Sequence, residues 1–99
     1  TAIGPCLYVD KDPLPAETGI FLQIKRDGKV VFEDKTEIKQ MKRTFADLVE
    51  YLFRECDFPQ GVYLMTGTGI IPGNDFSLQS GDEISITSDP IGTLTNIVA

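Results

Sequence analysis

The sequence contains no histidine and no tryptophan, and only two of its 99 residues are cysteines. Without histidine, the chain cannot form a Ser-His or Cys-His nucleophile pair from its own side chains. Cys6 and Cys56 lie too far apart in the sequence to suggest a zinc site, and their apolar neighbours predict buried free thiols. The sequence therefore leaves the catalytic residues unknown.

Long hydrophobic runs and clustered basic residues are also missing. No apolar stretch approaches the roughly 20 residues that span a membrane. Nine Lys and Arg stand against fifteen Asp and Glu, which gives a formal net charge of −6. Nucleic-acid binding needs clustered cations that neutralise phosphates, and the one basic cluster, residues 39–43, is short and typical of a solvated turn before a helix. We expect neither a nucleic acid nor a membrane as a partner.

The acidic residues are numerous but scattered near predicted turns. A magnesium site needs carboxylates that converge with water and substrate oxygens, and the spacing along this chain gives no sign of convergence. We interpret these acids as solvated turn residues and predict no metal ligand among residues 1–99. Asp82, which follows Gly81, is expected to cap its turn.

The hydrophobic pattern predicts one main helix and several strands. Apolar residues at helical spacing indicate a helix over residues 45–56, with Thr44 and Asp47 close to a capping box. Asp27-Gly28 predicts a type I′ hairpin between two strands. The expected strands cover residues 3–9, 20–26, 29–34, 62–66, 83–88 and 91–98. This order indicates an α+β fold, a mostly antiparallel sheet with the helix covering one face.

A loop rich in threonine and glycine is the best candidate site. Thr66, Gly67, Thr68 and Gly69 follow a predicted buried strand. Glycine lets the backbone approach a ligand, freed N–H groups point at anions, and a threonine hydroxyl donates to a carboxylate or carbonyl oxygen. The Gly-Lys-Thr/Ser ending of a phosphate loop is missing. The pattern allows an anion-binding loop or a plain strand-to-turn transition.

Several short motifs follow one another along the chain. Gly4-Pro5 is followed by the Asp27-Gly28 hairpin, a Met-plus-helix element beginning at Gln40-Met41, and Thr-Gly-Thr at residues 66–68. Gly-Asp at residues 81–82 and Ile-Gly-x-Leu-x-Asn at residues 91–96 close the series. This ordered set covers essentially the whole chain and resembles the fumarylacetoacetate hydrolase family. Gly-Ile-Ile-Pro at residues 69–72 looks more like the branch near the 2-keto-3-deoxy sugar-acid dehydratases.

The resemblance implies a mixed β-roll and an enzyme that needs Mg²⁺ or Mn²⁺ and acts on 2-oxo or 1,3-dioxo acids. Family members hydrolyse C–C bonds, decarboxylate, isomerise or dehydrate, with the metal as Lewis acid. Thr68 matches the family threonine that contacts the substrate carboxylate, and Thr66, Gly67 and Gly69 are its loop neighbours. A homodimer is implied for the full enzyme. The missing signal peptide suggests a cytoplasmic location.

The family's Glu-x-Glu pair, two further aspartates and catalytic lysine have no match within residues 1–99, so they would lie upstream. The chain opens at Thr1 without a methionine. We therefore expect residues 1–99 to be the C-terminal portion of a catalytic domain, a fragment that has the remainder of its parent chain as partner and is inactive alone.

A second interpretation is a non-enzymatic, acidic β-grasp-like binding module, since a hairpin, a helix and further strands describe that fold too. A sulfur carrier of that type needs a Gly-Gly tail. This chain instead ends in Asn96-Ile97-Val98-Ala99. A monodisperse, well-folded monomer would favour the module.

Overall fold

The predicted hairpin forms one half of the sheet in the structure, a computed structural model that describes residues 1–99. β1 (Gly19–Arg26) and β2 (Lys29–Glu37) pair antiparallel. Their turn has Asp27 at φ 50° and Gly28 at φ 74°. Positive φ at both positions is the requirement of a type I′ turn, which confirms the prediction from Asp27-Gly28.

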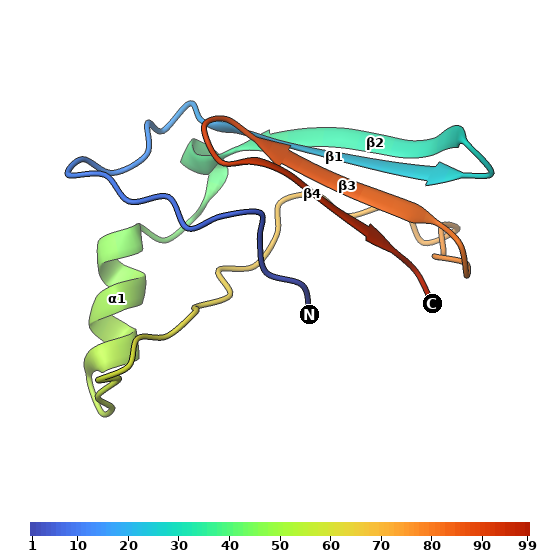
Figure 1. Cartoon of the computed structure of the whole chain (residues 1–99). Coiled ribbons are helices and arrows are strands. Elements are labelled where there is room, and N and C mark those ends of the chain that lie inside the picture. Colours follow the sequence, from blue (N-terminus) through green and yellow to red (C-terminus); the bar gives the residue numbers. More distant parts are fainter.

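β3 (Glu83–Ser88) and β4 (Gly92–Ile97) extend the sheet on the other side of β1. The strand order is β2-β1-β3-β4, and every neighbouring pair is antiparallel (Figure 1). The α+β fold with a mostly antiparallel sheet is thereby confirmed. The last predicted strand, residues 91–98, is shorter by one residue at each end.

The two faces of the sheet differ in polarity because side chains alternate along each strand. Leu22 and Ile24 of β1 lie opposite Ile86 and Ile84 of β3, which makes one face apolar. The other face carries paired hydroxyls, with Ser85 and Thr95 oxygens 3.2 Å apart and those of Thr87 and Thr93 2.8 Å apart.

The loop segment between the helix and β3 supplies the cover of the apolar face. Ile70 from this segment and Ile24 are buried, and the Phe76 ring lies 5.6 Å from the Phe32 ring of β2. Only four of the 99 residues are buried: Ile24, Ile70, Thr36 and Asp82. The core is therefore small and half polar.

α1 (Phe45–Phe53) begins as its sequence predicts. The Asp47 N–H donates to Thr44 Oγ1 at 3.1 Å and the Thr44 N–H donates to Asp47 Oδ2 at 3.2 Å, so the capping box is complete. The helix ends three residues earlier than predicted, at the point where the Phe58 ring meets the Phe53 ring edge-on at 5.4 Å.

The expectation that the helix covers the sheet is wrong. α1 follows the short 3₁₀ helix η1 (Ile38–Gln40) and stands beside one end of the sheet rather than across its face (Figure 1). None of its residues is buried, and Phe45, Val49 and Phe53 of its apolar stripe are between 41% and 51% exposed.

Two predicted strands are absent. Residues 3–9 and 62–66 run without a ladder partner, and the apolar side chains in residues 62–66 are exposed. A strand needs a neighbour for its N–H and C=O groups. Residues 3–9 do touch the β3–β4 turn, where Cys6 Sγ donates to the Ile91 carbonyl at 3.3 Å, but they form no strand pairing there. The cysteine prediction was half right, because Cys6 and Cys56 are free but exposed. No helix of the structure has the length and apolar character needed to cross a membrane.

Candidate functional site

The threonine–glycine loop, residues 66–69, is held by its own local bonds. Gly67 has φ +91°, a conformation that glycine adopts without steric cost. Thr68 Oγ1 accepts from the Ile70 N–H at 3.1 Å and donates to the Ile70 carbonyl at 3.2 Å. Since Ile70 is buried against the sheet, this small turn fixes the loop at the sheet surface. The Thr66 hydroxyl has no partner within the chain.

Gly69 lies directly against Thr36 of β2. A Cβ added at Gly69 would come within 2.9 Å of Thr36 Oγ1 and 3.6 Å of Thr36 Cβ. Contacts below 3.0 Å are essentially never seen for real Cβ atoms, so the position admits glycine only unless Thr36 moves. The close approach joins the loop to the end of the sheet.

Thr36 in turn holds Gln40, the last residue of η1. The Thr36 Oγ1 hydroxyl donates to Gln40 Oε1 at 2.5 Å. Thr36 is buried, whereas Gln40 is exposed. This bond occupies the acceptor end of the carboxamide and leaves its two N–H donors free.

A groove of about 800 Å³ lies between these elements. It is lined by the chain around η1 and by the threonine–glycine loop with Ile70. Its other lining residues come from the sheet and from α1: Ile20, Ile86 and Leu48. The size is that of a small-molecule pocket, and the lining mixes apolar side chains with a few polar groups.

The electrostatics of the groove favour an anion. Glu37 is neutralised by Lys39, whose Nζ lies 2.6 Å from Glu37 Oε2, and this pair raises the pKa of Lys39. Lys42 and Arg43 also line the groove and form no ion pair within the chain. The basic cluster at residues 39–43 is the exposed turn before a helix that the sequence predicted, and it also supplies two unpaired cations to the groove.

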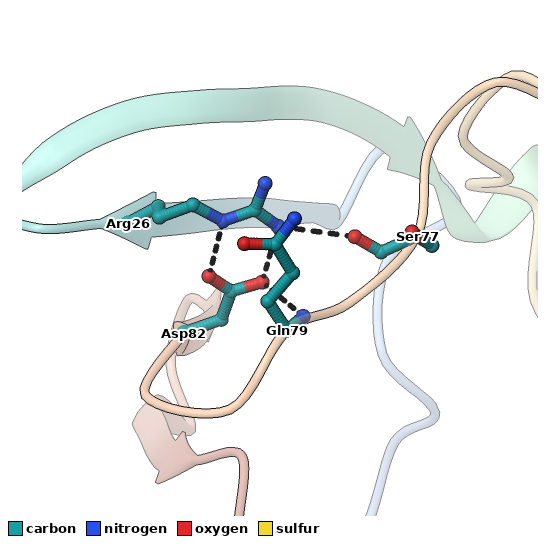
Figure 2. Close-up of polar contacts among 4 residues, drawn as sticks. All are labelled: Arg26, Ser77, Gln79 and Asp82. Atoms are coloured by element: carbon teal, nitrogen blue, oxygen red, sulfur yellow. Dashed lines mark hydrogen bonds and ion pairs between the residues drawn. The ribbon is translucent and has the colours of Figure 1, made fainter.

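A second polar cluster lies at the hairpin end of β1 (Figure 2). Arg26 Nε and Nη2 each donate to one Asp82 oxygen at 2.8 Å, and Nη2 also donates to the Ser77 carbonyl at 3.0 Å. The Gln79 N–H donates to Asp82 Oδ2 at 2.8 Å. These donors hold the pKa of Asp82 at about 2, below its ordinary value of 3.8.

Asp82 is fully buried, so its interpretation as a solvated turn acid is wrong. The expectation that it caps its turn is correct, through the Gln79 N–H. The sequence did contain a signal for the burial. Arg26 falls on the same side of β1 as Leu22 and Ile24, and a cation on an apolar face requires a buried acceptor.

No three His, Cys, Asp or Glu side chains come together in residues 1–99.

Sequence reasoning selected the threonine–glycine loop but missed its neighbours. The structure places Thr66, Gly67, Thr68 and Gly69 together along the groove. Thr36 and Gln40 were not selected, because their contact depends on the fold of β2 into η1. The only sequence signal for this contact was the spacing of four residues between the Thr36 hydroxyl and the Gln40 amide.

A model of the family described as "Fumarylacetoacetate (FAA) hydrolase C-terminal" matches residues 1–99. A Haloferax volcanii protein named "Probable 2-keto-3-deoxyxylonate dehydratase" is 39% identical over 98 residues, which are 98% of this chain and 34% of that protein. A Saccharolobus solfataricus protein named "2-dehydro-3-deoxy-D-arabinonate dehydratase" is 38% identical over 94 residues, 94% of this chain and 32% of that protein.

Solved structures agree with the sequence relatives. A 2-keto-3-deoxy-D-arabinonate dehydratase complexed with magnesium and 2,5-dioxopentanoate aligns with a TM-score of 0.81 and 38% identity, over 90% of this chain and 31% of that one. The chain spans about a third of the length of the curated relatives it matches. The resemblance drawn from the motif order, including the dehydratase branch, is confirmed, and the β-grasp module is not favoured.

Proposed function

Because the chain belongs to the fumarylacetoacetate hydrolase family, we propose that it is the C-terminal portion of the catalytic domain of a divalent-metal-dependent dehydratase that removes water from a 2-keto-3-deoxy sugar acid. The observation that carries the proposal is the groove itself. A loop of two threonines and two glycines faces the same space as two unpaired cations. The curated dehydratases named above are 38–39% identical to this chain along nearly all its length.

The proposed reaction balances as the loss of one water. A five-carbon 2-keto-3-deoxy acid carries hydroxyls on its last two carbons. Loss of the C4 hydroxyl and one hydrogen as water gives an enol that keeps its oxygen at C5, and tautomerisation of this enol leaves an aldehyde at C5, which is 2,5-dioxopentanoate. That compound is the one bound in the magnesium complex of the similar structure.

The threonine–glycine loop is proposed to bind the substrate carboxylate. The Thr68 hydroxyl has one hydrogen, which it now gives to the Ile70 carbonyl at 3.2 Å. It can turn that hydrogen to a carboxylate oxygen and still accept from the Ile70 N–H at 3.1 Å. A charged acceptor forms the stronger bond, so an arriving carboxylate competes well for this donor. Lys42 and Arg43 add attraction for the same anion.

The divalent metal, Mg²⁺ or Mn²⁺, is proposed to bind outside residues 1–99, because these residues hold no cluster of ligands. When bound, such a metal stabilises negative charge that develops on the oxo acid. The rest of the parent chain would then supply both the metal ligands and the proton-transferring groups. A homodimer and a cytoplasmic location stay predictions.

The test is an assay of the complete protein, expressed from the whole reading frame that contains this chain. Purified protein is incubated with 2-keto-3-deoxy-D-arabinonate and Mg²⁺, and the new aldehyde is quantified. We expect turnover that EDTA abolishes and that either Mg²⁺ or Mn²⁺ restores. Turnover of this acid that is insensitive to EDTA, or no turnover of 2-keto-3-deoxy sugar acids, would contradict the proposal.

A further inference from the structure

The carboxamide of Gln40 is oriented by a bond that the sequence gives little reason to expect. Thr36 Oγ1 donates to Gln40 Oε1 at 2.5 Å, from a buried hydroxyl to an exposed side chain. A buried donor with one fixed acceptor restricts where the amide nitrogen points. Gln40 Nε2 makes no bond within the chain, although its side chain lines the groove.

The same hydroxyl is the point that the threonine–glycine loop approaches. Thr36 Oγ1 lies where even a methyl group on Gly69 would collide with it. The Thr36–Gln40 pair therefore lies beside the loop, at the part of the groove that we assign to the carboxylate. The amide N–H groups are donors only, and a carboxylate is an acceptor only.

We propose that Gln40 is a substrate-binding residue whose amide N–H donates to the carboxylate end of the 2-keto acid, and that Thr36 is its positioning residue. The inference rests on the proposed function and adds a second source of donors to the carboxylate subsite. Thr36 acts through Gln40, because its one hydroxyl hydrogen is given to Gln40 Oε1. It fixes the amide so that nitrogen, rather than oxygen, faces the anion.

Four variants of the complete protein test this assignment, with 2-keto-3-deoxy-D-arabinonate as substrate and Mg²⁺ present. Gln40→Ala removes the donor and should raise KM about three- to tenfold, with a smaller change in kcat. Gln40→Glu keeps an acceptor for Thr36 but puts a carboxylate against a carboxylate. We expect it to raise KM more than tenfold at neutral pH, and the rise to shrink as the pH falls and the glutamate is protonated.

The Thr36 variants test whether Thr36 orients the Gln40 amide without itself contacting the substrate. Thr36→Val keeps the shape but loses the donor, and should raise KM about threefold because the amide is free to turn. Thr36→Ser keeps the hydroxyl and should restore KM to within about twofold of the wild type. The thermal unfolding midpoint of each variant is measured alongside. If Thr36→Val fails to fold, the comparison of Gln40→Ala with Gln40→Glu decides, since Gln40 is exposed.

The outcomes distinguish a substrate-binding role of Gln40 from a purely structural one. A purely structural role for the Thr36–Gln40 bond predicts that Gln40→Glu behaves like the wild type while Gln40→Ala is impaired, and that result overturns the inference. An unchanged KM in both Gln40 variants overturns it as well and leaves the dehydratase proposal intact. Absence of turnover in the wild type removes the dehydratase proposal and the Gln40 inference with it.

Discussion

Asp82 is the most completely buried side chain of the molecule, and Arg26 is its counterion. The two-pronged contact, each bond 2.8 Å long, ties the turn before β3 to the end of β1. A buried carboxylate without its partners is costly, so either half of the pair is hard to replace. This contact holds one end of the loop segment that covers the apolar face. It lies at the Arg26 end of β1, whereas the groove lies at the Ile20 end.

Replacing Asp82 tests that role. Asp82→Asn keeps the shape but removes the charge, and leaves Arg26 without a counterion. We expect the thermal unfolding midpoint of the complete protein to fall by roughly 10 °C. Asp57→Asn, at an exposed position without an ion pair, is the control and should change the midpoint by less than about 2 °C. Equal midpoints for the two variants would show that the contact contributes nothing.

The pH dependence of stability follows from the lowered pKa of Asp82. Its pKa falls from the ordinary 3.8 to about 2 on folding. The stabilisation is therefore fully present above about pH 5, declines as the pH falls below 3.8, and is lost as the pH falls through about 2. Urea unfolding between about pH 2 and pH 5 should show a smaller pH slope for Asp82→Asn than for the wild type. A variant slope as steep as the wild-type slope would contradict this assignment.

Two glycines of the threonine–glycine loop are required for different reasons. Gly69 is close to Thr36, whereas Gly67 has open space but a φ of +91°. Gly69→Ala should therefore displace Thr36 and raise the substrate KM, with a loss of roughly 1–3 kcal/mol of stability. Gly67→Ala should cost about 1 kcal/mol through backbone strain alone. Urea unfolding and steady-state kinetics check both variants. A Gly69→Ala protein with the wild-type KM would contradict the role given to the close contact between Gly69 and Thr36.

For single residues, the sequence predicts backbone conformation and helix capping better than it predicts burial and long-range contacts. The positive φ of Asp27 and Gly28 follows from local chemistry, and so does the Thr44–Asp47 cap. The burial of Asp82 and the contact of Gly69 with Thr36 depend on residues more than thirty positions away. Such pairs emerge only once the strand register is known.

Among the helices and strands, α1 shows what local sequence signals can predict and what they cannot. Its start is set by the capping box, which is complete in the structure. Its packing is not local, and the stripe that predicted a covered sheet is instead half exposed. The amphipathic pattern predicts that the apolar face of the helix packs against another surface, but it does not identify that surface.

The cap itself offers a prediction. Thr44→Ala removes the hydroxyl that accepts from the Asp47 N–H and should destabilise the first turn of α1 by about 1 kcal/mol. Amide hydrogen exchange at Asp47 should then quicken roughly fivefold. Thr44→Ser, which keeps the hydroxyl, is the control. Equal exchange rates in the alanine and serine variants would mean that the cap does not hold the turn.

Strand prediction succeeded where both partners are present in the chain and failed elsewhere. β1, β2, β3 and β4 find antiparallel neighbours within residues 1–99. Residues 62–66 have strand composition but no partner, so their apolar side chains are exposed. Composition reports a tendency to pair, while pairing itself is a property of the whole sheet.

For the whole molecule, the main feature is how little is buried. Only four residues are buried, and many large apolar side chains are more than 40% exposed. A folded domain of this size normally covers far more of its apolar surface. The chain spans about a third of its curated relatives, and we infer that the rest of the parent protein covers these surfaces.

The isolated chain should behave accordingly. Residues 1–99 expressed alone should bind the dye ANS and self-associate in sedimentation velocity, because the apolar stripe of α1 and the sheet edges are uncovered. The complete protein should bind little dye and sediment as one species. A monodisperse monomer of residues 1–99 with cooperative unfolding would contradict this inference.

The central claim is that the threonine–glycine loop holds the carboxylate of a 2-keto-3-deoxy acid. The most direct test is the KM of the complete protein for 2-keto-3-deoxy-D-arabinonate after Thr68→Val, set against Thr93→Val on the polar face of the sheet. Because Thr68 donates to a charged acceptor in this account, its loss should raise KM roughly tenfold or more, and Thr93→Val should leave KM unchanged. An equal KM for the two variants would contradict the account.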